Sequence, residues 1–478
     1  MTTARIDDAA ATLIIAGTGP RPANAQLVGP RARVEGRITG GGKTWKVTFP
    51  LEASRWGGPV LPLPTGDYEL AIDGADLGEI DIAPTVLPGV RIAVDGTQVR
   101  IAAPVDPVYE SIEGQTTLEE RYVAQVGGTE NAVFFESFYG RSVGCNPQAI
   151  DRELAARAPA VLRYWSVVDL SVPVPDGAIA VVEGSPEWWR ARAAARLLVV
   201  NDWLRRRFAR KVGQKVLQTW HGTPLKRLAL HRPGFDPRRM AAVVKESRRW
   251  DVLLAQNPYS ARILKKAYAF FGRPIWVEGY PRNDALTTGD PAAIRAALGI
   301  RADERVLLYA PTWRDDRSEM VDFIDAEQLA TQADAVVLVR GHSRTLLQGR
   351  DHSGARVIDV TGYPETAQLL LAADALITDY SSVMFDFSVT GKPMYFLVPD
   401  LDHYRGELRG FYFDLAERAP GPLVHSQDEL AAALADSGTE AAYAARYAAW
   451  RAQFNARDDG RAAERVVDRI LDQGFVTR

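Results

Sequence analysis

A histidine at the end of a strand-like run is the first candidate for chemistry in this sequence. The segment Gln218–Lys226, QTWHGTPLK, places His221 just after the run Lys215–Gln218 and before a turn broken by Gly222 and Pro224. In an open α/β sheet, ligands bind outside the carboxyl ends of the strands. Because the ordinary histidine pKa lies near ~6.5, His221 is predicted to act as a general base. The alternative is a histidine that only hydrogen-bonds its own turn.

A second strand end carries an arginine and a histidine. The apolar run 336–339 leads into Arg340, His342 and Ser343. Arginine donates to phosphate in a fork, and histidine can donate or accept a proton. We therefore predict that Arg340 and His342 neutralise the phosphates of a donor or leaving group, unless this is an ordinary exposed strand end. His221 and His342 are expected to face each other across a cleft.

A third strand end combines a carboxylate with hydroxyl groups. The run 375–378 is followed by Asp379, Ser381 and Ser382, and a helix is predicted to begin near Ser381. Free amides and hydroxyls at a helix start bind phosphate, although Ser and Asp are also ordinary N-caps. We expect these residues to hold a phosphate. Other residues predicted to bind substrate are Gly222, Thr223, Arg282, Thr312 and Arg314.

A basic cluster precedes the strand that leads to His221. It is formed by Arg205, Arg206, Arg207, Arg210 and Lys211. In a chain of net charge −3 the cluster is a local asymmetry. It is predicted to attract a polyanionic acceptor or anionic lipid headgroups, against the alternative of a solvated helix face.

The elements that must position these residues fall into three regions. Residues 1–124 contain short alternating runs separated by glycine-rich turns, such as Thr44–Phe49 and Tyr68–Ile72, which predict a small β-sandwich with an accessory or docking role. Residues 125–290 and 291–478 each alternate apolar runs with helical patterns, which is typical of parallel sheets covered on both faces. The predicted fold class is therefore α/β, with two Rossmann-like halves around a cleft and a β-rich domain before them.

Composition excludes several classes of protein. The chain has 478 residues, of which 46% are hydrophobic and 24% charged, as in ordinary globular proteins. Lys+Arg 57 against Asp+Glu 60 gives no indication of nucleic-acid binding. The single cysteine, Cys145, excludes an internal disulfide and thiolate metal clusters. No run approaches the ~18 apolar residues of a membrane span, and no signal peptide or Walker A sequence is evident. We expect a cytoplasmic protein.

Five motifs together resemble one known family. They are the His221 segment Gln218–Lys226, Asn257–Ser260 (NPYS), Gly279–Asp284 (GYPRND), Ala310–Asp315 (APTWRD) and Thr378–Asp386 (TDYSSVMFD). In this order and spacing they resemble the CDP-glycerol glycerophosphotransferase family, the teichoic acid polymerase type. The resemblance implies a GT-B-like fold with the nucleotide on the C-terminal half. It also implies that His221 and His342 are the family's two essential histidines, and that Asp379–Ser382 lies at the donor diphosphate.

The resemblance leads to one predicted reaction. A polyol phosphate, glycerol phosphate first, moves from CDP-glycerol to a hydroxyl of a lipid-linked or polymeric teichoic-acid or capsule-like acceptor, and CMP leaves. No metal site is predicted and no cofactor is expected to be tightly bound, although a loosely held Mg²⁺ stays open. The acceptor is anionic, which predicts work at the inner face of the cell membrane as a peripheral protein. Three alternatives remain: a ribitol-phosphate transferase of the same family, a GT-B glycosyltransferase using a sugar nucleotide, and a non-catalytic binding module.

Overall fold

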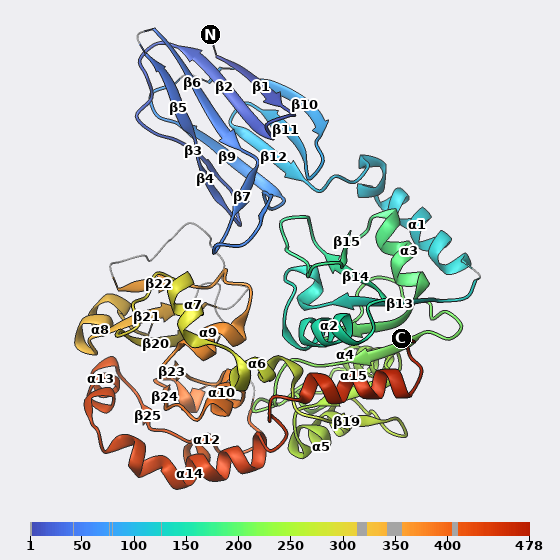
Figure 1. Cartoon of the computed structure of the whole chain (residues 1–478), viewed down its shortest axis with the longest axis vertical. Coiled ribbons are helices and arrows are strands. Elements are labelled where there is room, and N and C mark those ends of the chain that lie inside the picture. The colour runs from blue at the N-terminus through green and yellow to red at the C-terminus, as the bar shows by residue number, and fades with distance from the viewer. Residues whose placement is uncertain are drawn as a thin grey trace.

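The computed structural model places three folded regions along the chain (Figure 1). It describes residues 2–41, 43–75, 77–78, 80–125, 127–312, 323–341, 356–403 and 410–478, here called the described residues. A β-rich region comes first, followed by two α/β units whose sheets are entirely parallel. We call them the N-terminal sandwich, the first α/β unit and the second α/β unit. The predicted fold class, two Rossmann-like units preceded by a β-rich domain, is confirmed.

The N-terminal sandwich pairs two antiparallel sheets, ordered β1-β2-β6-β5 and β10-β11-β12-β9-β3-β4. Period-two alternation builds its core: in β6, Trp45, Val47 and Phe49 are buried while their neighbours face outward. A separate hairpin, β7–β8, leaves the sandwich on one side. The strands are β1 (Thr3–Asp7), β2 (Thr12–Thr18), β3 (Ala25–Val28), β4 (Arg33–Glu35), β5 (Arg37–Gly41), β6 (Thr44–Pro50), β7 (Glu52–Ser54), β8 (Val60–Pro62), β9 (Gly66–Ile72), β10 (Asp81–Val86), β11 (Arg91–Asp95) and β12 (Gln98–Ala102).

The first α/β unit is a seven-stranded sheet in the order β15-β14-β13-β16-β17-β18-β19. Its central strands are continuous apolar runs because helices cover both faces. The strands are β13 (Glu130–Glu136), β14 (Leu162–Val167), β15 (Ile179–Val182), β16 (Ala195–Val200), β17 (Lys215–Gln218), β18 (Val252–Ala255) and β19 (Ile275–Val277). The helices are η1 (Pro107–Glu110), α1 (Ile112–Ala124), η2 (Phe138–Gly140), α2 (Cys145–Arg157), α3 (Pro186–Ala194), η3 (Ala229–His231), α4 (Pro237–Ser247), α5 (Pro258–Ala267), η4 (Pro281–Asp284) and α6 (Ala285–Thr288).

The second α/β unit is a six-stranded sheet in the order β22-β21-β20-β23-β24-β25. The strands are β20 (Arg305–Ala310), β21 (Ala335–Val339), β22 (Val357–Asp359), β23 (Ala375–Thr378), β24 (Met394–Leu397) and β25 (Leu423–Val424). The helices from this region to the C-terminus are α7 (Pro291–Ala297), α8 (Ala326–Gln332), α9 (Thr366–Ala372), α10 (Val383–Phe387), η5 (Ser388–Thr390), α11 (Leu401–His403), α12 (Leu415–Arg418), α13 (Gln427–Ala435), α14 (Thr439–Phe454) and α15 (Ala462–Asp472).

Side-chain packing moves two of the predicted domain boundaries. Leu118 and Tyr122 of α1 are buried in the core of the first α/β unit, so this helix does not belong with the sandwich as the range 1–124 implied. At the other end, Val466 and Ile470 of α15 pack into the same unit beside α2, so the predicted range 291–478 is not one packing unit. The sequence pattern of a helix shows that one face is apolar. It does not show on which of the two units that face packs.

Candidate active site

His221 lies between the two α/β units, directly after β17, as its position in the sequence predicted. Its Nδ1 lies 2.7 Å from the backbone oxygen of Asn201, the residue after β16. Because a carbonyl oxygen only accepts, Nδ1 is the nitrogen that donates, so the lone pair of the neutral tautomer lies on Nε2. Trp220, held at a φ of 53°, stacks on the ring with centroids 4.8 Å apart, and the tilted Phe138 ring lies 5.7 Å from it. The ring is therefore held as a proton acceptor through Nε2.

The start of α10 in the second unit meets the His221 turn. A Cβ placed on Gly222 would lie 2.6 Å from Ser382 Oγ, so a side chain at 222 would displace this serine. Ser381 and Ser382 are half-buried, and the Ser382 side chain caps no backbone N–H of α10. Ser381 Oγ accepts only a long bond of 3.4 Å from the Val383 N–H. The structure thus brings the predicted base and the predicted phosphate-binding hydroxyls together.

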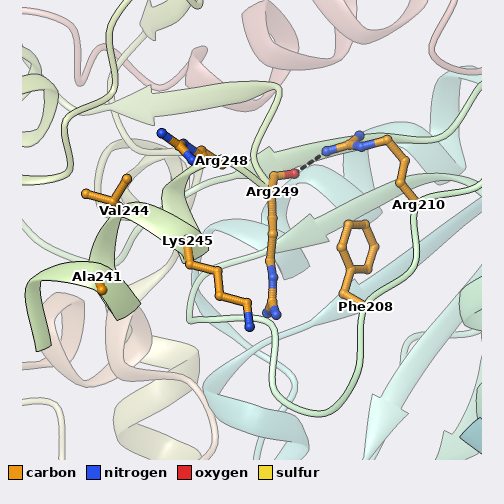
Figure 2. Close-up of a pocket in the computed structure, with 7 residues that line it drawn as sticks. All are labelled: Phe208, Arg210, Ala241, Val244, Lys245, Arg248 and Arg249. Atoms are coloured by element: carbon orange, nitrogen blue, oxygen red, sulfur yellow. Dashed lines mark hydrogen bonds between the residues drawn. The ribbon is translucent and has the colours of Figure 1, made fainter. Parts of the chain in front are cut away.

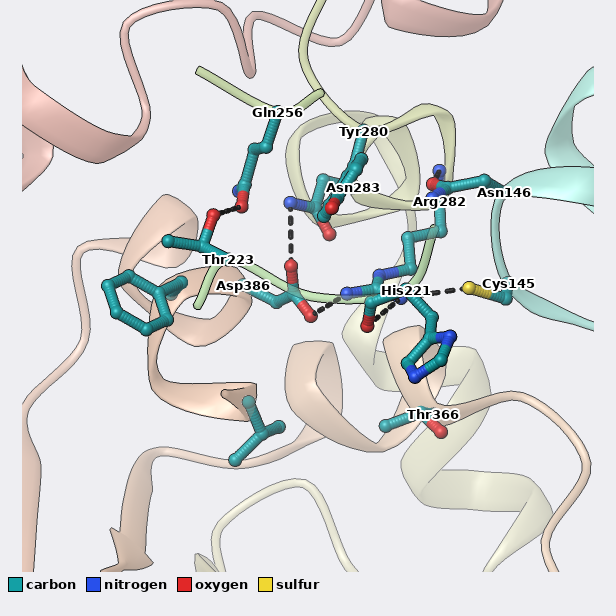
Figure 3. Close-up of polar contacts among 12 residues, drawn as sticks. Cys145, Asn146, His221, Thr223, Gln256, Tyr280, Arg282, Asn283, Thr366 and Asp386 are labelled. Atoms are coloured by element: carbon teal, nitrogen blue, oxygen red, sulfur yellow. Dashed lines mark hydrogen bonds and ion pairs between the residues drawn. The ribbon is translucent and has the colours of Figure 1, made fainter. Parts of the chain in front are cut away.

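Arg282 of η4 ties the two units together behind His221 (Figure 3). Its guanidinium donates to Asp386 Oδ2 at 2.6 Å, to the His221 carbonyl at 3.0 Å and to Cys145 Sγ at 2.8 Å. Although burial disfavours its charged form, Asp386 and Cys145 hold the pKa of Arg282 above its ordinary value. Since its donors are used inside the protein, Arg282 positions the His221 turn; the expectation that it binds substrate is corrected.

Thr223 also supports the turn rather than a substrate. Its side chain is 1% exposed, and its hydroxyl lies 2.5 Å from Gln256 Oε1 and 2.9 Å from Ser260 Oγ. The Asn257 amide adds a third bond to the same hydroxyl. A buried hydroxyl whose hydrogen-bonding capacity is filled cannot also bind a substrate. The prediction that Thr223 binds substrate is therefore corrected as well.

Asp379 holds the loop that follows β20. Its carboxylate is 2% exposed and accepts the Thr312 N–H with both oxygens, at 2.9 and 3.1 Å. A buried carboxylate would also repel a diphosphate. Asp379 therefore holds the backbone at Thr312, and the direct contacts at this motif stay a prediction for Ser381 and Ser382.

Arg340 has a different role from the one its residue type predicted. Its guanidinium donates to the carbonyls of Val360 and Tyr363, both at 3.1 Å, and to Thr366 Oγ1 at 2.8 Å. Burial lowers the pKa of Arg340 to about 10, which still leaves it charged at neutral pH. The guanidinium is thus used to hold the loop after β22, and the expectation that it neutralises the donor is corrected. Two other predicted residues, His342 and Arg314, lie outside the described residues.

The predicted basic cluster is largely neutralised within the protein. Arg205 and Arg206 both pair with Glu183, at 2.8 and 2.9 Å, and Arg210 pairs with Asp251 at 2.5 Å. Lys211 is buried and donates to backbone carbonyls at the C-terminal end of α1, so it cannot meet an acceptor or a membrane. Among these five cations Arg207 is exposed, and no ion pair is found for it among the described residues, so its role toward an acceptor or membrane stays a prediction.

A second basic surface lies nearby, around a pocket of about 510 Å³ (Figure 2). Lys245 and Arg248, on and just after α4, are exposed at its rim. Arg249 and Arg210 are already paired, with Glu246 and Asp251. The lining is completed by Phe208, Ala241 and Val244.

The described residues also bear on metals and membranes. Within these ranges no three His, Cys, Asp or Glu side chains gather closely enough to hold a metal ion. None of the helices in the described ranges has the length and apolar character needed to cross a bilayer.

The fold and the junction together define a class of protein. Two parallel α/β units meet at the carboxyl ends of β17 and β23, where the turn that carries His221 approaches the Ser382 hydroxyl through Gly222. This is the arrangement of a GT-B-like transferase. The chain belongs to the CDP-glycerol:poly(glycerophosphate) glycerophosphotransferase family, whose profile matches residues 121–472. The resemblance in the motifs is thereby confirmed.

Sequence similarity to two teichoic acid enzymes supports membership of this family. The chain is 38% identical over 320 residues to the teichoic acid poly(glycerol phosphate) polymerase of Bacillus subtilis (strain 168), covering 62% of this chain and 42% of that protein. It is 36% identical over 344 residues to the teichoic acid glycerol-phosphate transferase of Staphylococcus aureus (strain NCTC 8325 / PS 47), covering 64% of this chain and 83% of that protein. The match thus spans less than half the length of the first relative.

A solved structure shares the fold. The wall teichoic acid polymerase TagF aligns with a TM-score of 0.70 and 32% identity, over 76% of this chain and 94% of the other. A TagF histidine variant soaked with CDPG aligns with the same TM-score of 0.70, over 75% of this chain and 92% of the other.

Proposed function

We propose that this protein transfers glycerol phosphate from CDP-glycerol to a hydroxyl of a teichoic-acid-type acceptor, releasing CMP. The observation that carries the proposal is the close approach of Gly222, the residue after His221, to the Ser382 hydroxyl at the start of α10, with His221 Nδ1 bonded to the Asn201 carbonyl. Family membership and the TagF variant soaked with CDPG support CDP-glycerol as the donor.

The reaction follows from this geometry. The acceptor hydroxyl attacks the phosphorus that bears the glycerol, while His221 Nε2 takes the hydroxyl proton. A new P–O bond forms, the phosphoanhydride bond breaks, and its electron pair leaves with CMP. Ser381 and Ser382 donate to the diphosphate, and His342 and Arg314 supply positive charge beside it. Positioning and charge stabilisation supply most of the rate enhancement in such transfers.

The acceptor meets the first α/β unit in this proposal. An anionic polymer or its lipid anchor approaches the face that carries Arg207, Lys245 and Arg248, because these cations are exposed. The protein then works in the cytoplasm, peripherally at the inner face of the cell membrane. Any Mg²⁺ requirement is read directly by repeating the assay with EDTA.

The test is a product assay on the purified protein. CDP-glycerol, CDP-ribitol and a UDP-sugar are each incubated with a lipid-linked glycerol phosphate acceptor, and the released nucleotide is identified by chromatography. The expected result is CMP from CDP-glycerol with a lengthened acceptor. Faster CMP release from CDP-ribitol would identify a ribitol-phosphate transferase, and UDP release would identify a glycosyltransferase. No nucleotide release from any donor would support a binding module.

Replacing both serines, Ser381→Ala with Ser382→Ala, is expected to weaken donor binding more than it weakens the fold. Each lost hydrogen bond to a charged group is worth about 1.5–3 kcal/mol. Calorimetric titration with CDP-glycerol and a thermal melt on the same sample measure the two effects. The matched control is Ser426→Ala, because Ser426 caps α13 through the Glu429 N–H. A double-serine variant that lowers Tm as the control does, with an unchanged donor Kd, would leave these serines a capping role only.

Replacing Arg207, Lys245 and Arg248 with Gln is expected to weaken binding to anionic vesicles and raise KM for the acceptor. Each such cation contributes about 1 kcal/mol near an anionic surface, and added salt should weaken wild-type binding similarly. Liposome co-sedimentation measures the effect. The control variant replaces three exposed cations of the N-terminal sandwich, Arg33, Arg37 and Lys43, with Gln. Equal losses in both variants would show that net charge, not this face, controls binding.

A further inference from the structure

The N-terminal sandwich touches both α/β units at one end of their junction (Figure 1). In the first sheet the edge at this end is formed by β15 and β14, and in the second sheet by β22. The sandwich contacts the loops that follow β14 and β22, at Asp169 and Tyr363. Both contacts therefore lie at carboxyl ends of strands, on the side of the sheets where Gly222 and Ser382 also meet.

The contact with the first unit is polar and well satisfied. Asp169 follows β14 and is 2% exposed. It accepts the Thr65 N–H at 3.0 Å and the Thr65 hydroxyl at 2.8 Å, and it pairs with Arg31 of the sandwich. The Ser171 N–H and hydroxyl donate to its other oxygen. Because a buried carboxylate is held by donors from both sides, the sandwich is firmly docked on this unit.

The contact with the second unit is made by an aromatic side chain at the tip of the β7–β8 hairpin. The Trp56 ring lies 5.4 Å from that of Tyr363, at an interplanar angle of 67°. Trp56 and Gly57 have φ values of 53° and 69°, and the Gly58 N–H donates to the Arg55 carbonyl at 2.8 Å. These positive angles are those of a type I′ turn, whose first central position favours Asn or Gly. A tryptophan at this position is strained, so the turn geometry does not explain why the residue is a tryptophan. The contact made by its side chain does.

Tyr363 belongs to a loop that several parts of the protein share. Its carbonyl and that of Val360 accept from Arg340, and Thr361 Oγ1 accepts from the Gly341 N–H at 2.9 Å. Glu365 at the end of the same loop pairs with Arg152 of α2. The loop 360–366 therefore connects the carboxyl end of β21 in the second unit with the first unit, and Trp56 packs on its outer side.

We propose that the N-terminal sandwich forms a third wall of the junction and that Trp56 is a positioning residue for the donor-binding unit. By packing on Tyr363 it holds the loop 360–366, and through Arg340 it fixes the carboxyl end of β21. The effect on donor affinity rests on the proposed function, whereas the effect on the loop does not. This assigns a role to a domain that lies outside the matched residues 121–472.

The test variant is Trp56→Gly, measured in the full chain. Glycine favours the type I′ position, so this change removes the ring without destabilising the turn. Hydrogen–deuterium exchange of the peptide 356–366 is expected to become about three- to tenfold faster, the factor that loss of an aromatic pair produces. Exchange in the sandwich strands should stay at wild-type rates. KM for CDP-glycerol should rise by a similar factor while kcat at saturating donor changes less than twofold.

Three comparisons keep the proposal falsifiable. Trp56→Phe retains a ring and should restore slow exchange, and Tyr363→Ala should reproduce the glycine variant with no additional effect in the double variant. Val86→Ala removes an apolar side chain that is 62% exposed on β10 and should change nothing. Unchanged exchange at 356–366 in Trp56→Gly would overturn the positioning role, as would a kcat loss with constant KM. If the wild type releases no CMP, the proposed function fails. The exchange measurement still tests whether Trp56 holds the loop 360–366, because it does not depend on activity.

Discussion

His221→Ala is expected to abolish glycerol phosphate transfer while leaving CDP-glycerol affinity nearly unchanged. Loss of a general base typically costs about 10²–10⁴ in rate. The donor should still bind, because its predicted contacts lie on the second unit while His221 belongs to the first. CMP release under saturating donor measures the rate, and calorimetric titration measures donor Kd.

Two further measurements separate base chemistry from structural damage. Added imidazole should restore part of the rate, because the alanine leaves open the space that the ring fills beside Trp220 and Phe138. His231→Ala removes another half-buried histidine, whose Nδ1 lies 2.7 Å from the Tyr412 hydroxyl, and should lower the rate far less. A folded His221→Ala protein with near-normal turnover would end the assignment.

The sequence was sufficient for elements built from local patterns. The strands 215–218 and 375–378 have the predicted bounds, because each is a short run between turn residues. Strand β14 was not predicted, since Arg163 interrupts its apolar pattern. That arginine is buried because it pairs with Asp151 of α2, a contact that no local pattern encodes.

The site residues divide in the same way. His221 could be predicted because a strand end is a local feature that also sets where ligands bind. The roles of Arg340 and Arg282 could not, because residue type does not reveal whether a guanidinium finds its acceptors in a ligand or in loops and carboxylates distant in sequence. Asn201 was missed although it directly follows a strand-like run, the same signal that identified His221.

Breaking the ion pair behind His221 should cost both stability and activity. Arg282→Ala leaves the Asp386 carboxylate, whose side chain is 9% exposed, buried without its cation. Removing one partner of a buried pair costs about 3–5 kcal/mol. The matched control is Arg163→Ala, which breaks the equally buried pair with Asp151 away from the junction. Both variants should melt at lower temperature, but only Arg282→Ala should lose kcat in its folded fraction, because only Arg282 bonds the His221 carbonyl.

The cost of Arg282→Ala should depend on pH with a definite sign. Burial already raises the pKa of Asp386 above its ordinary value, and loss of Arg282 removes the opposing effect. A carboxyl group whose pKa is higher in the folded state stabilises the fold at low pH and loses that contribution as pH rises. The stability deficit of the variant should therefore be smaller at pH 5 than at pH 8.

The double variant Arg282→Met with Asp386→Leu should recover the wild-type melting temperature at both pH values, since apolar replacement of a buried pair is often neutral. It should not recover kcat, because the His221 turn still lacks its donor. Recovery of kcat together with the melt would show that Arg282 acts through stability alone.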